Sequence, residues 1–286
     1  MRNLDGINDG GPIADRDAEC CFSRGRALES AGELEEAERA YRDALILDDT
    51  RADWYYRLGC VLRKSGRVPD AAVAFAEAVA CDGQQTRYLT NLGAALDDLG
   101  RRDEAVATYT RAVNVGGDTA DAHHNMGAIH AEEGRTREAI RSFEAALDQR
   151  PDADGHINLG LVYYHAGDLE PALESFEAAS AASPDSARSH YFAGLALLKK
   201  GVNNEAYARF QKAFRLDDRL VRSHLHAGVC LHKMERYEDA LASLYRALDH
   251  LPDDGRLHYQ LALTLDALMM HQEARRHYRL ARGEGN

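Results

Sequence analysis

Glycine returns at a nearly constant interval along most of this chain. The steps are of 34 residues, with one of 33, and alanine takes the eighth place: Gly25, Gly59, Gly93, Gly127, Gly160, Gly194, Gly228 and Ala262. An internal period of this length predicts repeated supersecondary units, each of which buries its apolar face against the next. A chain of 286 residues built in this way does not need one large globular core.

Three further columns keep the same register. Two of them hold alanine in every copy: Ala37, Ala71, Ala105, Ala139, Ala172, Ala206, Ala240 and Ala274, then Ala44, Ala78, Ala112, Ala146, Ala179, Ala213, Ala247 and Ala281. Between them stands an aromatic column with Leu244 as its exception: Tyr41, Phe75, Tyr109, Phe143, Phe176, Phe210 and Tyr278. Small residues let paired helices approach closely, and we expect the aromatic ring to fill the remaining space.

A second glycine set marks the turns between paired helices. It follows the first set by seven residues: Gly32, Gly66, Gly100, Gly134, Gly167 and Gly201. Glycine tolerates the positive φ at which a helix ends and reverses. Pro69 and Pro171 are expected to open second helices, where a missing N–H is harmless, whereas Pro151, Pro184 and Pro252 are expected to close the repeats. The period therefore predicts an all-α fold with one helix pair in each repeat.

These columns closely resemble the signature of the tetratricopeptide-repeat family. The resemblance implies a right-handed superhelical solenoid of eight helix-turn-helix repeats, which would occupy residues 18–286 after a flexible leader of residues 1–17. The expected repeats are 18–51, 52–85, 86–119, 120–152, 153–186, 187–220, 221–254 and 255–286. The last repeat departs from the pattern at Ala262 and Met269, and its final helix carries a set of arginines that predicts a polar cap: Arg275, Arg276, Arg279 and Arg282.

Charge and composition narrow the function classes. A formal net charge of −12 argues against a nucleic-acid partner, because such proteins need a basic face. The cysteines have neither CxxC spacing nor a disulfide framework and are expected to be reduced thiols: Cys20, Cys21, Cys60, Cys81 and Cys230. The sequence has no apolar run long enough for a membrane span and no signal-peptide core, so a cytoplasmic location is expected.

Neither an enzyme nor a metal protein is expected. Five of the thirteen histidines share one column: His123, His156, His190, His224 and His258. Packed helices lie roughly 8 to 10 Å apart, too far for residues one repeat apart to share a metal, so these histidines are interpreted as half-buried structural residues. No nucleophile motif, phosphate-binding loop or paired-carboxylate signature occurs, and no catalytic residue or cofactor is predicted.

The family resemblance implies that the first helix of each repeat lines a concave groove. It assigns the following peptide-binding residues: Asn91, Asn125, Asn158, Leu161, Tyr164, Arg188, Tyr191, Phe192, Leu195, Arg222, Leu225, His226, Val229, Arg256, Tyr259 and Gln260. The asparagines share one place in three repeats, which is similar to the asparagine ladder of the O-linked N-acetylglucosamine transferase repeat domain. Amides can hold a peptide backbone whatever its sequence, although asparagine is also common at this place in such repeats.

Two further patterns run along the predicted groove. Arg188, Arg222 and Arg256 stand 34 residues apart and would either bind partner carboxylates or pair with acidic neighbours within the fold. Apolar residues of the later repeats are expected to form one exposed stripe beside them: Ile157, Leu161, Tyr164, Tyr191, Phe192, Leu195, Leu225, Val229, Tyr259 and Leu263. An exposed apolar stripe of this size favours a partner that covers it.

The resulting hypothesis is a non-enzymatic protein-protein interaction module. It would bind a peptide or amphipathic helix of a partner in its groove, as an adaptor, co-chaperone or assembly factor. Two alternatives remain open at this point: a scaffold that self-associates through its terminal repeats, and the substrate-recognition subunit of a separate enzyme.

Overall fold

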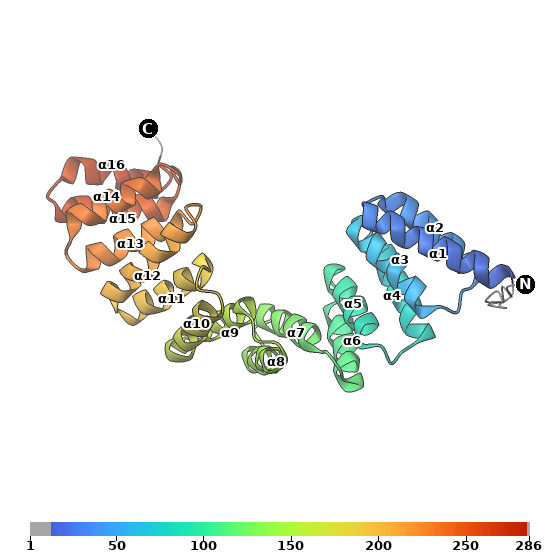
Figure 1. Ribbon diagram of the computed structural model, residues 1–286. Coiled ribbons are helices and arrows are strands. Elements are labelled where there is room, and N and C mark those ends of the chain that lie inside the picture. The colour runs from blue at the N-terminus through green and yellow to red at the C-terminus, as the bar shows by residue number, and fades with distance from the viewer. Residues whose placement is uncertain (1–12, 285–286) are drawn as a thin grey trace, which may run out of the picture. The chain divides into compact units, whose positions relative to one another are not determined.

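The computed structural model describes residues 13–284 (Figure 1). This part of the chain forms sixteen α-helices and no strand. The helices are α1 (Ile13–Ala31), α2 (Leu34–Leu47), α3 (Ala52–Lys64), α4 (Val68–Cys81), α5 (Thr86–Asp98), α6 (Arg102–Val115), α7 (Ala120–Glu132), α8 (Thr136–Gln149), α9 (Ala153–Ala166), α10 (Leu169–Ala182), α11 (Ala187–Lys200), α12 (Asn203–Leu216), α13 (Arg222–Lys233), α14 (Tyr237–Leu248), α15 (Gly255–Ala267) and α16 (His271–Ala281).

Each expected repeat holds one consecutive pair of these helices, which confirms the predicted all-α repeat fold. Pro69 and Pro171 lie in the first turns of α4 and α10, and Pro184 follows the end of α10, as the sequence predicts. The first helix begins at Ile13, before the expected start of the first repeat at residue 18. The preceding part of the expected leader lies outside the described residues.

The glycine and aromatic columns meet inside the helix pairs. A Cβ atom added to Gly59 would lie 2.6 Å from the Phe75 ring, and one added to Gly194 would lie 2.7 Å from the Phe210 ring. Such distances are shorter than real Cβ contacts, so only glycine allows the two helices to come this close. Both rings are fully buried. The close approach predicted from the sequence is confirmed, and it forms the repeating core of the fold.

The turn between paired helices requires a positive φ in every repeat whose turn is described. Gly201, for example, adopts a φ of 85° after α11. At the same place in the last two repeats, Glu235 and Met269 adopt φ values of 61° and 62°. Residues with a Cβ are strained in this left-handed region, so the final two turns keep the shape of the motif without its preferred residue.

The chain divides into two compact units, one ending at Ile129 and the other beginning at His130. The first unit holds α1 to α6 and most of α7, and its core includes Trp54, whose ring stacks on Phe22 with centroids 5.1 Å apart. The second unit holds the end of α7 and helices α8 to α16. Within it, the first helices of consecutive repeats contact one another in the order α9, α11, α13 and α15. These four helices therefore share one face of the unit.

The last helix, α16, has the composition of a cap. Ala274 is its buried residue, and its three arginines are exposed, as is Arg282 directly after its end. Charged side chains keep this exposed face hydrated. The polar end predicted from the sequence is confirmed.

Candidate functional site

All sixteen residues assigned to the groove lie on first helices of repeats. Asn91 on α5 and Asn125 on α7 belong to the first unit, and the other fourteen belong to α9, α11, α13 and α15 of the second. Those four helices contact one another in sequence, so the second unit carries most of the predicted site on one continuous face.

The apolar stripe is not exposed as expected. Ile157 is 1 % exposed and Leu225 is 6 % exposed. Leu225 packs in a cluster with Leu244 and Leu257, because the next helix pair covers that side of α13. The prediction that these two residues belong to an exposed stripe is therefore wrong. Tyr259 is exposed, and the remaining members are half-buried: Leu161, Tyr164, Tyr191, Phe192, Leu195, Val229 and Leu263.

Aromatic contacts explain why the middle of the stripe is half-buried. The His226 ring on α13 stacks on Phe210 with centroids 5.4 Å apart, and Tyr191 on α11 lies 5.8 Å from His226. Tyr191 also meets Phe210 edge-on at 5.9 Å. Such ring pairs stabilise the packing of successive helices by about 0.5–1.5 kcal/mol each beyond the area that they bury. Tyr191 and His226 are therefore part of the packing as well as of the surface.

The predicted asparagine column is engaged within the protein. Asn91 Nδ2 donates to the Arg87 carbonyl at 2.8 Å, and Asn125 Nδ2 donates to the Tyr109 hydroxyl at 3.1 Å. Asn158 also has a partner within the fold. These contacts favour a structural role for the asparagine amides, which are half-buried. Their role in binding a peptide backbone stays a prediction.

The three arginines of the second predicted ladder differ in their partners. Arg188 pairs with Asp154 of the preceding repeat at 2.9 Å. Within the part of the chain that the structure describes, no carboxylate lies within 4.0 Å of Arg222 or Arg256. The first arginine is thus occupied, whereas the other two are available to an external anion.

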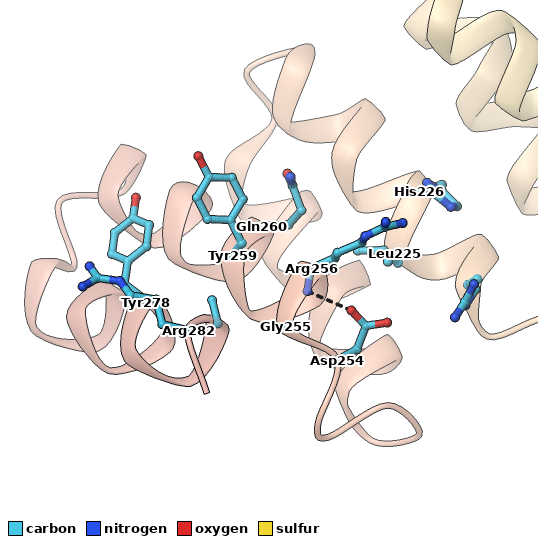
Figure 2. Close-up of a pocket in the computed structure, with 11 residues that line it drawn as sticks. Leu225, His226, Asp254, Gly255, Arg256, Tyr259, Gln260, Tyr278 and Arg282 are labelled. Atoms are coloured by element: carbon cyan, nitrogen blue, oxygen red, sulfur yellow. Dashed lines mark hydrogen bonds between the residues drawn. The ribbon is translucent and has the colours of Figure 1, made fainter. Parts of the chain in front are cut away.

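Arg222 and Arg256 line one cavity of about 990 Å³ between α13, α15 and α16 (Figure 2). Six of the predicted groove residues line this cavity, which we call the arginine pocket: Arg222, Leu225, His226, Arg256, Tyr259 and Gln260. The close-up shows Tyr259 and Tyr278 at one side and Arg256 and His226 at the other. These six residues thus come together at one cavity, and their role in binding stays a prediction.

The arginine pocket is cationic. Arg222, Arg256 and Arg282 line it together with one carboxylate, that of Asp254. This carboxylate caps α15, since Asp254 Oδ1 accepts hydrogen bonds from the backbone N–H groups of Arg256 at 2.9 Å and Leu257 at 3.1 Å (Figure 2). The Asp254 carboxylate therefore compensates the unpaired N–H groups at the start of α15 as well as the positive charge of the neighbouring arginines. Arg282 pairs with Glu284 at 3.7 Å, so Arg222 and Arg256 are left beside the one carboxylate of the lining. This balance favours an anionic ligand.

The same charges act on His226. Burial lowers its pKa first, the positive charges of Arg222 and Arg256 lower it further, and Asp254 opposes them, so that the pKa falls to about 4. His226 is therefore neutral at physiological pH and contributes a polar aromatic wall rather than a further charge.

Tyr278 of α16 and Arg282, which directly follows α16, are functional candidates that the family-derived groove places do not include. Tyr278 is the last member of the aromatic column, yet it is half-buried, whereas the earlier members are buried. It follows Ala262, the one residue of the packing column with a side chain, and Met269, which replaces the turn glycine. These two departures in the last repeat are the sequence signal that could have identified Tyr278.

Metal binding and membrane insertion find no support in the described residues. No group of three or more His, Cys, Asp or Glu side chains is placed to hold a metal ion there. His190 and His258 of the histidine column are buried and donate through Nε2 to the carbonyl oxygens of Pro184 and Pro252, at 3.4 and 2.8 Å. Among the helices that the structure describes, none has the length and apolar character of a membrane span.

Solved structures of repeat proteins share this fold. The C-terminal part of a TPR repeat-containing protein from Cytophaga hutchinsonii superposes with a TM-score of 0.71 at 16 % identity, over 84 % of this chain and 99 % of that one. YrrB, described as a TPR protein with an unusual peptide-binding site, gives 0.58 at 24 % identity, over 69 % and 99 %. MamA gives 0.52 at 20 % identity, over 56 % and 94 %. These likenesses show the fold.

Sequence comparisons identify the repeats directly. No curated protein sequence matches the chain. A model of subunit 3 of the anaphase-promoting complex, or cyclosome, matches residues 172–247. Two tetratricopeptide-repeat models match residues 22–86 and 124–187, and residues 86–115. The two repeat models together match more than half of the sequence, and the helix pairs follow the same register, so the chain belongs to the tetratricopeptide-repeat family.

Proposed function

We propose that this protein is a non-catalytic interaction module that binds an acidic peptide segment of a partner in the arginine pocket. The tetratricopeptide fold itself indicates a role in protein-protein interaction. The observation that carries the finer proposal is the pair of arginines, Arg222 and Arg256, that face one cavity without a carboxylate partner among the described residues. Guanidinium groups bind carboxylates through two parallel hydrogen bonds, which gives both strength and orientation.

The charge of the whole chain supports this assignment. Cations on a protein with a net charge of −12 would ordinarily find internal partners, as Arg188 does with Asp154. Arg222 and Arg256 lie in the same column one and two repeats later and have none within the described residues. Acidic side chains of a partner would neutralise them.

The other walls of the arginine pocket suit a peptide. Tyr259 is 48 % exposed and meets Tyr278 edge-on, with ring centroids 6.0 Å apart, so the two rings offer an aromatic surface to an apolar side chain. Gln260 adds an amide that both donates and accepts hydrogen bonds. The cavity volume of about 990 Å³ lies at the upper end of the range for ligand sites. We therefore expect an acidic residue next to an aromatic or aliphatic one.

Fluorescence anisotropy tests this proposal. The probe is a short labelled peptide in which acidic residues flank one leucine, and its control replaces each acidic residue by the corresponding amide. The double variant Arg222→Gln/Arg256→Gln should weaken binding of the acidic peptide by at least tenfold, since charged hydrogen bonds contribute roughly 1.5–3 kcal/mol each. Arg188→Gln is the matched control, because Arg188 shares the column but lies outside the pocket.

Two outcomes would contradict the proposal. One is equal binding of the acidic and the amide peptide. The other is equal loss of binding in the Arg188 variant and in the double variant. Light scattering of the unliganded protein across concentrations tests the alternative of a self-assembling scaffold, which requires an increase in mass without any added partner.

A further inference from the structure

A second cavity of about 420 Å³ lies between α12, α13 and α14. It is lined by the side of α13 that faces away from the arginine pocket. Successive helical residues are rotated by about 100°, so Ser223, His224 and Ala227, which line the second cavity, lie opposite Arg222 and Leu225. We call this the second-helix cavity, because α12 and α14 are the second helices of two consecutive repeats.

The second-helix cavity contains a buried hydroxyl group without a hydrogen-bond partner. Ser223 is 1 % exposed, and its Oγ finds no partner among the described residues. One repeat earlier, the equivalent Ser189 donates to the Ser186 carbonyl at 2.8 Å and accepts from Ser180 at 2.9 Å. Phe214 takes the place of Ser180 in the later repeat, and so removes one partner. A buried hydroxyl without a partner destabilises the fold, and a ligand that bonds to it would remove this cost.

Two arginines lie at the same end of this cavity. Arg215 is in the last turn of α12 and Arg246 is in the last turn of α14. The intervening α13 runs in the opposite direction, so its first turn, with Ser223, lies beside both. Within the described part of the chain, neither arginine has a carboxylate within 4.0 Å. Two unpaired cations and an unpaired hydroxyl therefore converge on one end of the cavity.

The site is held together by contacts between its helices. The hydroxyl of Ser243 on α14 donates to the His224 carbonyl at 2.9 Å, and the His224 ring meets Phe214 with centroids 3.7 Å apart. Burial and then the positive charge of Arg246 lower the pKa of His224 and favour its neutral form. The acidic residue of the lining, Asp239, lies in the first turn of α14 and is paired with Arg236 at 2.6 Å.

The rest of the second-helix cavity has a mixed lining, in which Tyr207 and Gln211 stand beside aromatic and aliphatic residues. Phe210, Phe214, Ala227 and Leu231 form its floor beyond the cationic end. A ligand that fits must therefore combine a negative head group with a small apolar body. The volume suits a small organic acid rather than a folded segment of another chain.

We propose that the second-helix cavity binds a small organic oxyanion, a carboxylate or phosphate on an aromatic or aliphatic body, with its head group between Arg215, Arg246 and the Ser223 hydroxyl. This site is separate from the arginine pocket and does not depend on the function proposed for that pocket.

Isothermal titration calorimetry of the full chain tests the proposal with phenyl phosphate, benzoate and the uncharged analogue benzyl alcohol. At least one of the two anions should bind saturably. The anion that binds with the higher affinity shows whether the site prefers a phosphate or a carboxylate head group. The double variant Arg215→Gln/Arg246→Gln should weaken that binding by at least about tenfold, and Ser223→Ala by about threefold or more. The control Arg188→Gln, which lies outside both cavities, should bind as the parent does.

Several results would overturn the proposal. One is binding of benzyl alcohol as tight as that of the anions, and another is the absence of saturable binding of either anion. The others are unchanged binding in the Arg215 and Arg246 double variant and equal loss of binding in the Arg188 control. Thermal melting of each variant shows whether it is folded. Arg215 and Arg246 are exposed and make no ion pair within the described residues, so their double variant should melt near the parent temperature.

Discussion

Glu235 and Met269 show, at the scale of single residues, how strongly the repeat dictates backbone shape. Both residues adopt a positive φ where six other repeats have glycine. The left-handed conformation is roughly 1–2 kcal/mol less favourable for residues with a Cβ, and packing of the flanking helices must compensate.

Replacing either residue by glycine should therefore stabilise the protein. We expect Glu235→Gly and Met269→Gly each to raise the free energy of unfolding by about 0.5–1 kcal/mol, because relief of strain exceeds the added entropy of the unfolded chain. The reverse change at an equivalent turn, Gly201→Ala, should lower it by a similar amount. Urea denaturation measures all three. A glycine variant less stable than the parent would show that these turns are not strained.

His226 predicts a dependence of stability on pH. Its pKa is about 4 in the folded state, against 6.5 for an unperturbed histidine. The unfolded chain therefore binds a proton between pH 6.5 and 4 that the folded chain does not, so stability falls as the pH falls through this window. The loss from this group between pH 7 and 5 is about 2 kcal/mol.

The variant His226→Gln should lose less stability than the parent between pH 7 and 5, by about the same 2 kcal/mol. The control is His271→Gln, because His271 is exposed. Urea denaturation at the two pH values measures the difference. Parallel losses in the parent and in the His226 variant would mean that the His226 ring is solvated in the folded state.

At the scale of helices, the sequence reveals which residues share a face but not how deeply each is buried. The contact between the glycine and aromatic columns is predictable, because each ring packs against a glycine of its own helix pair, where a Cβ would not fit. The burial of Leu225 depends on Leu244, Leu257 and Leu261, which come from the next two helices. The exposure of Tyr278 depends on how α16 packs against α15. Neither can be read from one repeat alone.

Because Leu225 is buried and Tyr259 is exposed, we expect replacement of each by serine to have a different effect on stability. Leu225→Ser should lower the free energy of unfolding by about 2–5 kcal/mol, because it opens a cavity in an apolar cluster and buries a hydroxyl. Tyr259→Ser should change stability little, since Tyr259 is 48 % exposed, but should weaken binding of the acidic peptide. Denaturation and anisotropy measure the two quantities. If the Leu225 variant melts like the parent, Leu225 is exposed rather than buried.

At the scale of the whole molecule, the contacts join helices of the same repeat or of adjacent repeats. The stability of such an array is close to a sum of repeat and neighbour terms, so it should fall toward the ends. We expect hydrogen exchange to be fastest in α1 and α16, which pack against fewer helices than those inside each unit. Uniform protection from the first to the last repeat would instead indicate one cooperative core.

The central claim is that the arginine pocket receives an acidic peptide, and hydrogen exchange of the full chain with and without that peptide tests it most directly. The account predicts new protection at the start of α13, the start of α15 and the end of α16, retained in Arg188→Gln and lost in Arg222→Gln/Arg256→Gln. Protection confined to the first unit, or unchanged in the double variant, would contradict it.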